Sequence, residues 1–165
     1  MSVVIKDRDY LYDWEQIKEY LPHRYPFLFI DRVISVDRSK ASSPDSKINV
    51  AVHAMKCITG NEHMLQGHFP HLAVVPGVML VEMMAQSSIF VLPLEVLQKR
   101  KPQVFLSKIM ECSFRSMARP GDVLDIHCVV ASEKGRFYTM NTTIDERSTQ
   151  RRICEGRFMA YLELK

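Results

Sequence analysis

The chain has 165 residues, of which 47% are hydrophobic and 25% are charged, a composition typical of a soluble globular protein. Its formal net charge of +3 is too small to indicate a nucleic-acid-binding protein, and no apolar run reaches the ~18 residues that a transmembrane helix needs. We therefore expect one domain over residues 1–165, with neither nucleic acid nor a membrane as a partner.

The N-terminal segment and the cysteines both indicate a cytoplasmic protein. Residues 1–16 become charged within six positions and lack the apolar core of a signal peptide. The cysteines are widely separated and form no CxxC pair. We therefore expect four reduced, mostly buried thiols, at Cys57, Cys112, Cys128 and Cys154.

Three elements are predicted before residue 60. Asp13 and Gln16 have the spacing of a capping box, so a short helix should begin after Asp13 and stop at Pro22. Segments 27–37 and 48–59 are rich in β-branched and aromatic or other apolar residues and are predicted to be strands. The polar segment between them should be a loop.

The middle of the chain is predicted to be a long structured loop followed by a buried helix. Residues 60–76 are irregular and contain Gly and Pro, and Pro76 suits the first helical position because it lacks an N–H. The helix should continue to Val91, and Pro93 should end or kink it. Because its residues are apolar on nearly every side, we expect most of its surface to be buried.

The C-terminal half alternates apolar and polar residues, which predicts three or four antiparallel strands. Turns are expected at residues 118–122 and 133–135. The faces predicted to be apolar are Leu106, Met110, Cys112 and Phe114, interrupted by Lys108; Leu124, Ile126, Cys128 and Val130; Tyr138, Met140, Thr142 and Ile144; and Cys154, Phe158, Ala160, Leu162 and Leu164. A helix that is apolar on all sides needs a curved cover, so we expect an α+β fold in which a long central helix is wrapped by a curved antiparallel sheet.

Glu82 is a carboxylate in the middle of this apolar helix, and Gln86 lies one turn further along the same face. An apolar setting would raise the pKa of the Glu82 carboxyl toward neutrality, which a general acid working near pH 7 needs. The alternative is a structural Glu82 that is satisfied by Gln86 and nearby backbone, or one exposed at a gap in the sheet.

Two further features lie before Glu82. His68 follows Gly67 in a turn that could aim an imidazole at a cavity as a base, although a loop histidine is also common as an ordinary polar residue. The Gly77 N–H should lack a partner inside the helix and could receive a carbonyl oxygen, as in an oxyanion site, although a plain helix start would look the same. The spacing of His63, His68 and His71 matches no metal-ligand pattern, so no metal is expected.

Four motifs resemble a known family. They are LPHRYPFLFIDRV (21–33), NE-x3-QGHFP (61–70), PGVMLVEMMAQ (76–86) and FR-x3-RPGD (114–122). On these motifs the chain resembles the β-hydroxyacyl-acyl carrier protein dehydratases of the FabZ type, from about residue 14 to the C-terminus. The resemblance implies a hot-dog fold and the dehydration of (3R)-3-hydroxyacyl-acyl carrier protein to trans-2-enoyl-acyl carrier protein in fatty acid biosynthesis, with no metal or organic cofactor.

The resemblance also implies site residues and an assembly. His68 and Glu82 would be the catalytic pair, contributed by opposite protomers of a homodimer, and three dimers would form a hexamer. The enolate oxygen would be stabilised by the Gly77 N–H, with His68 as base and Glu82 as acid, or with these roles reversed or shared. Gln86 would orient Glu82 or a water.

Alternatives to this interpretation stay open. Glu82 favours simple dehydration, because the related FabA-type dehydratase/isomerases carry Asp there. His71 stands where the family often has Gly, and segments 72–74 and 93–102 are less typical, which leaves chain length and a specialised polyene or polyketide-like pathway open. A hot-dog thioesterase and a non-catalytic acyl-binding relative are the other candidates, and the presence of both His68 and Glu82 argues against them.

The implied carrier protein is acidic, so basic residues should steer it to the site. The candidates are Lys99, Arg100, Lys101, Arg115 and Arg119, each of which could also be ordinary solvated charge. Residues that could line an acyl tunnel are Phe69, Val78, Met79, Met83 and Phe90, although Met and Phe at helical spacing are usually core.

Overall fold

The computed structural model describes residues 9–93, 96 and 103–163. Its helices are α1 (Trp14–Tyr20) and α2 (Gly77–Ser88), and the short 3-10 helices η1 (His63–Gln66) and η2 (Ile89–Val91) lie before and after α2. The strands are β1 (Arg32–Asp37), β2 (Ala51–Cys57), β3 (Gln103–Phe114), β4 (Val123–Lys134), β5 (Phe137–Glu146) and β6 (Arg152–Glu163). The predicted order of elements is confirmed, including the capping box of α1, in which Asp13 and Gln16 bond each other's backbone.

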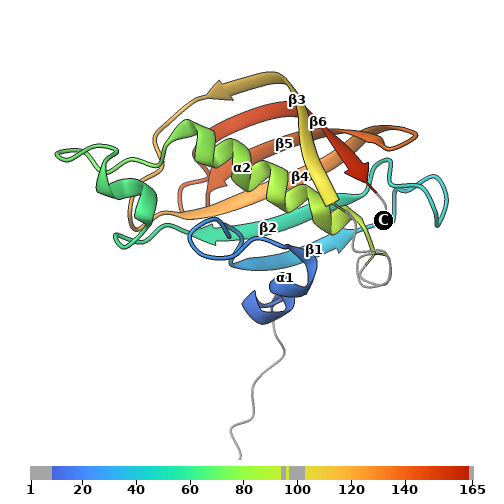
Figure 1. The fold of residues 1–165 in the computed structure, drawn as a ribbon, viewed down its shortest axis with the longest axis horizontal. Coiled ribbons are helices and arrows are strands. Elements are labelled where there is room, and N and C mark those ends of the chain that lie inside the picture. The colour runs from blue at the N-terminus through green and yellow to red at the C-terminus, as the bar shows by residue number, and fades with distance from the viewer. Residues whose placement is uncertain (1–8, 94–95, 97–102, 164–165) are drawn as a thin grey trace, which may run out of the picture.

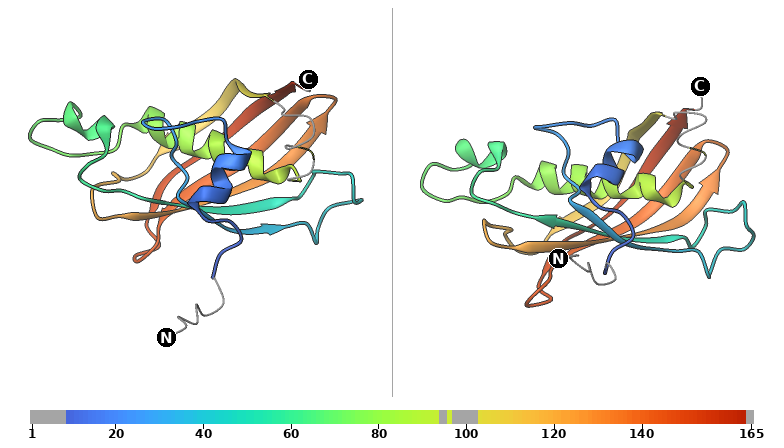
Figure 2. Two further views of the ribbon diagram at one scale, coloured as in Figure 1. Left: turned by 60° about the horizontal axis from the view of Figure 1, so that its bottom comes forward. Right: turned by 90° about the horizontal axis from the view of Figure 1, so that it is seen from below.

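The six strands form one antiparallel sheet that curves around α2 (Figures 1 and 2). The strand order is β1-β2-β4-β5-β6-β3, so β1 and β3 are the two edges. Helix α2 runs across the concave face, and α1 lies beyond the β1 edge (Figure 1). This arrangement is the hot-dog fold, and it confirms the predicted central helix wrapped by an antiparallel sheet.

The concave face of the sheet and the inner side of α2 form the core. The predicted alternation in β4, β5 and β6 is confirmed, because the inward residues of all three strands are buried; Leu164 lies outside the described residues. The helix contributes Leu80, Met83 and Met84 to the same cluster. This continuous apolar packing fixes the position of α2 relative to the sheet.

Strand β1 begins later than predicted, at Arg32 rather than near residue 27. The reason is a side chain of α2. Gln86 Oε1 accepts the N–H of Phe29 at 2.9 Å, and Gln86 Nε2 donates to the carbonyl of Phe27 at 2.8 Å. The backbone of residues 27–29 is therefore tied to the helix instead of to a neighbouring strand.

The predicted alternation along β3 is wrong, because two irregularities interrupt its ladder with β6. The register shifts between Leu106 and Lys108 and again between Ile109 and Glu111. Each such bulge moves the following side chains to the other face of the strand. Strand β3 is also an edge of the sheet, and it exposes apolar residues along most of its length: Phe105, Leu106, Ile109, Met110 and Phe114.

Helix α2 is less completely buried than predicted. Pro76 is its N-cap rather than its first residue, and α2 ends at Ser88, from which η2 continues to Val91. Val78 is 73% exposed, and Glu82 and its neighbours on that side are only half-buried. One stripe of the helix therefore lies outside the core. No helix in the described ranges has the length and apolarity needed to cross a bilayer.

The four cysteines are free thiols. Cys128 and Cys154 are buried, whereas Cys57 and Cys112 are half-buried. Burial raises the pKa of the Cys128 and Cys154 thiols to about 12. Both therefore remain protonated at neutral pH and act as small apolar side chains in the core.

Candidate active site

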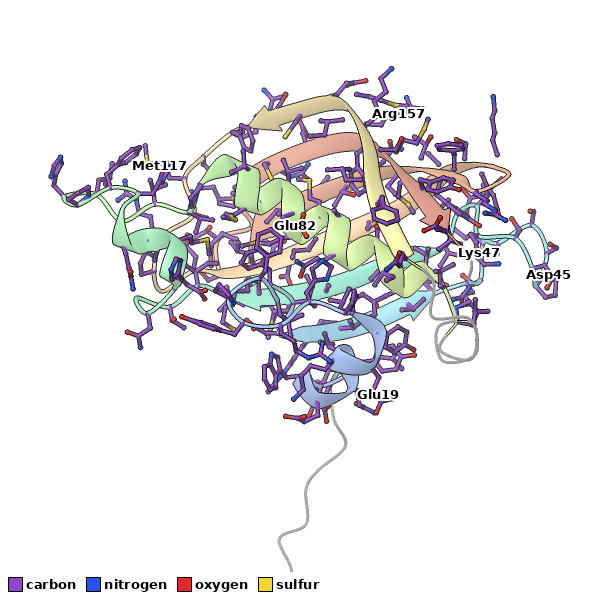
Figure 3. All side chains as sticks on the ribbon, in the orientation of Figure 1. Glu19, Asp45, Lys47, Glu82, Met117 and Arg157 are labelled. Atoms are coloured by element: carbon purple, nitrogen blue, oxygen red, sulfur yellow. The ribbon has the colours of Figure 1, made fainter. Side chains whose placement is uncertain are left out.

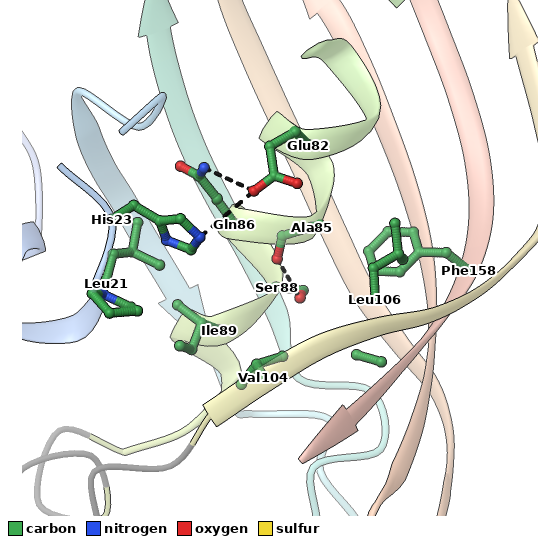
Figure 4. A pocket seen from close by; sticks show the side chains of 12 residues that line it. Leu21, His23, Glu82, Ala85, Gln86, Ser88, Ile89, Val104, Leu106 and Phe158 are labelled. Atoms are coloured by element: carbon green, nitrogen blue, oxygen red, sulfur yellow. Dashed lines mark hydrogen bonds and ion pairs between the residues drawn. The ribbon is translucent and has the colours of Figure 1, made fainter. Parts of the chain in front are cut away.

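Glu82 lies midway along α2, and the amide of Gln86 holds one of its carboxylate oxygens (Figures 3 and 4). Gln86 Nε2 donates to Glu82 Oε1 at 2.9 Å. Because the bonds of Gln86 to the 27–29 backbone fix its amide, the donor cannot turn away from Glu82. No side chain or backbone group of the described residues bonds Oε2, so this oxygen is the one available to a ligand.

A cavity opens beside Glu82, between α2, the segment that follows α1, and β3 (Figure 4). We call it the Glu82 cavity. Its polar side chains include His23, Glu82 and Gln86. Its apolar wall includes Leu21, Ala85, Ile89, Val104, Leu106 and Phe158. A few convergent polar groups in an apolar hollow are typical of a small-molecule site.

His23 was not predicted to belong to the site. Its Nε2 lies 3.7 Å from Glu82 Oε1, and its Nδ1 is buried without a hydrogen-bond partner among the described residues. Burial lowers the pKa of His23, and Arg24 lowers it further, while the Glu82 carboxylate opposes both. The ring is therefore neutral near pH 7.

His68 lies in the loop between η1 and α2, and its ring is oriented by the backbone. His68 Nδ1 is 2.9 Å from the carbonyl oxygen of Val74. A carbonyl can only accept, so Nδ1 carries the proton and the neutral ring keeps its lone pair on Nε2. The ring also stacks on Phe69, with centroids 4.1 Å apart. This arrangement leaves the Nε2 lone pair of a neutral His68 free of a partner among the described residues.

Among the described residues of one chain, those that line the Glu82 cavity do not include His68. The segment between β2 and α2, which carries His68, projects beyond one end of the sheet (Figures 1 and 2). Glu82 lies in the middle of α2 (Figure 3), and His68 is not among the residues that line the Glu82 cavity.

The N-terminal end of α2 has free backbone donors. Met79 and Leu80 donate to the Pro76 carbonyl, and no backbone carbonyl in the described ranges accepts the N–H of Gly77 or Val78. The helix dipole makes this end favourable for an oxygen that gains negative charge. The Gly77 N–H thus has the free donor and the favourable dipole that the predicted oxyanion role needs.

Gly77 also provides space for the ring of Phe114. A Cβ built on Gly77 would lie 2.8 Å from Cζ and 2.9 Å from Cε1 of that ring. We expect Gly77→Ala to lower the free energy of unfolding by about 1 kcal/mol, at the lower end of overpacking costs, because the ring is 54% exposed and can turn aside. Chemical denaturation checks this. When Gly77→Ala is made in the Phe114→Ala variant, it should no longer lower the free energy of unfolding relative to Phe114→Ala alone. An unchanged loss in the double variant would show that the strain lies in the backbone.

The other predicted substrate-contacting residues separate into two groups. Phe69 and Val78 are 49% and 73% exposed, and Met79 is half-buried. Met83 and Phe90 are fully buried core residues, and neither lines the Glu82 cavity. The Glu82 cavity instead uses residues of the segment after α1, β3 and β6.

The basic residues predicted to steer a carrier protein also differ among themselves. Lys99, Arg100 and Lys101 lie outside the described residues. Arg115 is paired with Glu155 through bonds of 2.6 and 3.0 Å, which offsets its charge. Arg119 and Arg151 line one exposed hollow with Asp122 and Met117, the last of which is labelled in Figure 3. Because Val75 donates to the Ala118 carbonyl at 2.9 Å, this hollow lies close to the start of α2.

Within residues 9–93, 96 and 103–163, no group of three or more His, Cys, Asp or Glu side chains is placed to hold a metal ion. Sequence reasoning overlooked His23 and the contact between Gly77 and Phe114. The sequence signal that could have identified His23 is its place in the LPHRYPF motif, one of the four motifs that carry the family resemblance. The Phe114 contact had none, because the two residues are far apart in the chain.

Comparison with known proteins identifies the family of this chain. The FabA-like domain family matches residues 21–156. The FabZ 3-hydroxyacyl-[acyl-carrier-protein] dehydratase of Rickettsia rickettsii (strain Sheila Smith) is 33% identical over 132 residues, 80% of this chain and 84% of that protein. The protein of the same name from Rickettsia akari (strain Hartford) is 31% identical over 153 residues, 93% of this chain and 97% of that protein.

Solved structures share the fold at lower identity. The dehydratase heterocomplex ApeI:P from Xenorhabdus doucetiae has a chain that superposes with a TM-score of 0.67 at 22% identity, over 88% of this chain and 89% of that one. A hypothetical thioesterase from Streptococcus pneumoniae TIGR4, solved with coenzyme A, gives a TM-score of 0.54 at 14% identity, over 79% and 88%. The chain belongs to the FabA-like family and, by identity and coverage, to its FabZ-type 3-hydroxyacyl-[acyl-carrier-protein] dehydratases.

Proposed function

We propose that this protein dehydrates 3-hydroxyacyl-acyl carrier protein to trans-2-enoyl-acyl carrier protein in fatty acid biosynthesis. The observation that carries the proposal is the state of the two side chains: His68 presents a lone pair on Nε2, and Glu82 has one oxygen held by Gln86 and one free. These are the features of a base and an acid. The names of the Rickettsia relatives support the same reaction.

The reaction can be written with this chain's groups alone. His68 Nε2 takes the α-proton of the thioester, and the electrons move onto the carbonyl oxygen, which the Gly77 N–H stabilises. The electrons then form the Cα–Cβ double bond as the β-hydroxyl leaves, protonated by Glu82 Oε2 to give water. A proton passing from His68 back to Glu82 restores the starting state. Each proton is carried by a side chain, so the proposal includes no metal or organic cofactor.

We place His68 and Glu82 of each site on opposite protomers of a homodimer. The support is that one chain holds them in separate regions and leaves the Val78 side of α2 uncovered. A facing copy could bring its own His68 loop to this exposed stripe. The hexamer and the cytoplasmic location that were expected from the sequence stay predictions.

The β3 edge supports the same dimer. It is twelve residues long and exposes Phe105 and Ile109 by 50% each. A long apolar edge strand with unpaired backbone groups is rarely left uncovered, because it would pair with other chains. Pairing with β3 of a second copy would cover this edge and also approach α2, which β3 crosses in Figure 1. A symmetric dimer would cover both the β3 edge and the exposed Val78 side of α2 with one interface.

The acyl chain has an apolar path beyond Glu82. A second hollow shares Ser88, Ile89 and Val104 with the Glu82 cavity and continues to Tyr138 and Leu162. Its lining is largely apolar and offers no charged group, and a hydrocarbon tail would enter it by displacing side chains. We propose that the tail of the substrate lies along this path while its thioester lies at the start of α2.

The first test is hydration of a crotonyl thioester, the reverse reaction. The enoyl absorbance should fall with no release of free thiol, because water adds to the double bond and the thioester stays intact. Release of thiol with the double bond unchanged would instead identify a thioesterase, the activity in the name of the Streptococcus relative in fold. The proposal would be contradicted if neither hydration nor thiol release occurred with the coenzyme A thioester or with the carrier-protein thioester.

Arg119 is the residue for testing carrier-protein docking. It lies near the start of α2 beside Arg151, whereas Arg115 is already paired with Glu155. We expect Arg119→Gln to raise KM for a carrier-protein substrate by about three- to tenfold, since charge at the rim of an interface mainly changes association. In the matched control Arg115→Gln, KM for the carrier-protein substrate should change by less than about twofold. An equal rise for a short thioester without carrier would contradict a docking role.

A further inference from the structure

We infer that His23 is a positioning residue that keeps the acid proton of Glu82 on its free oxygen, Oε2. The inference rests on the proposed dehydratase function and deepens it. It starts from a histidine that lines the Glu82 cavity and that no step of the reaction above uses. Three observations carry it: a rigid position, a short list of partners, and a neutral ring.

The position of His23 is fixed from both sides. Arg24 Nη1 donates to the carbonyls of Leu21 and His23 at 2.8 and 2.6 Å, which ties this segment to the end of α1. On the other side, Gln86 binds the backbone of Phe27. The imidazole is thereby held at the rim of the Glu82 cavity, and Figure 4 shows it pointing toward the carboxylate.

The partners of the ring determine which nitrogen carries the proton. His23 Nδ1 is buried and has no hydrogen-bond partner among the described residues, so a proton there would have no acceptor. His23 Nε2 lies 3.7 Å from Glu82 Oε1, so a proton there points at an oxygen. The neutral ring therefore favours the Nε2–H form, which closes on Oε1 with a small shift of either side chain.

Glu82 Oε1 then faces two donors, His23 Nε2–H and Gln86 Nε2–H. An oxygen that faces two donors is the acceptor of the carboxyl group and cannot also carry its proton favourably. The acid proton is thus directed to Oε2, the oxygen that no described residue bonds. A carboxyl group that is already turned this way needs no rearrangement when the β-hydroxyl leaves.

The positioning role also depends on the neutral state of His23. Its ring faces two charged groups, Glu82 from α2 and Arg24 from its own segment. Burial lowers the pKa of His23 and opposes an imidazolium at this position. The ring therefore orients the Glu82 carboxyl group as a neutral donor.

Kinetics of two variants test the role. We expect His23→Ala to lower kcat by about tenfold or more with KM changed less than about threefold, because orientation of the acid matters mainly in the transition state. His23→Gln, which keeps a neutral N–H near the Nε2 position, should restore kcat to within about threefold of the wild type. The control His63→Gln replaces an exposed histidine of η1 and should leave both constants unchanged. Equal losses in both His23 variants, or a wild-type kcat in His23→Ala, would overturn the inference.

A measurement without turnover separates this inference from the proposed function. Nitrogen-15 NMR of histidine-labelled protein at pH 7 should show His23 neutral, with Nε2 protonated and Nδ1 bare. A proton on Nδ1, or an imidazolium at this pH, would overturn the inference even if the wild type is an active dehydratase. An inactive wild type would instead overturn the proposed function, whatever the state of His23.

Discussion

We expect Glu82→Gln to fold normally and to lower kcat for dehydration by about 100- to 10,000-fold, the usual range for losing a general acid or base. The amide keeps the size of the carboxyl group and can still accept the Gln86 Nε2 hydrogen bond at its oxygen. It cannot release a proton to the departing hydroxyl. The measurement is the initial rate of enoyl absorbance, with circular dichroism and thermal unfolding as the test of folding.

The matched control is Glu15→Gln. Glu15 lies in the first turn of α1, largely exposed, and pairs only with Lys18 within the described chain. The control should leave kcat unchanged and alter stability by less than about 0.5 kcal/mol. If Glu82→Gln retained more than about a tenth of wild-type kcat, Glu82 would be a structural residue satisfied by Gln86, the alternative that the sequence left open.

The second large effect is expected for His68→Asn, again a loss of about 100- to 10,000-fold in kcat. Asn can place an amide N–H near the position of Nδ1 and keep the bond to the Val74 carbonyl, so the loop should stay in place. It has no basic nitrogen to take the α-proton. The control is His71→Asn, an exposed residue of the same loop, which should keep full activity. Equal losses in the two variants would point to loop structure rather than to a base.

The fold was predictable wherever the sequence pattern depends on local burial. Every second residue of β4 from Leu124 to Val130 is apolar, and all four are fully buried. The start of β1 was not predictable, because it depends on Gln86, which lies 57 residues away from Phe29 in the chain. Strand β3 was predicted to have one apolar face, but its two bulges have no marker in the sequence other than Lys108.

The candidate site could be predicted in its residue types but not in its arrangement. The apolar helix around Glu82 and the turn at His68 made both side chains candidates, and the resemblance to the FabZ-type family selected them. Which tautomer His68 adopts depends on the Val74 carbonyl, and which oxygen of Glu82 is free depends on Gln86 and His23. These are contacts between segments, so only the folded chain reveals them.

The most direct test of the central claim, a dehydratase site made by His68 and Glu82 of two protomers, is to mix the two inactive variants. Co-expressing His68→Asn with Glu82→Gln should restore about a quarter of wild-type activity, because half of the randomly formed dimers are mixed and each holds one intact site. The rate should be read with a carrier-protein substrate and with the two parent variants as baselines. Recovery to that level would support the shared site. A mixture as inactive as its parents would contradict it.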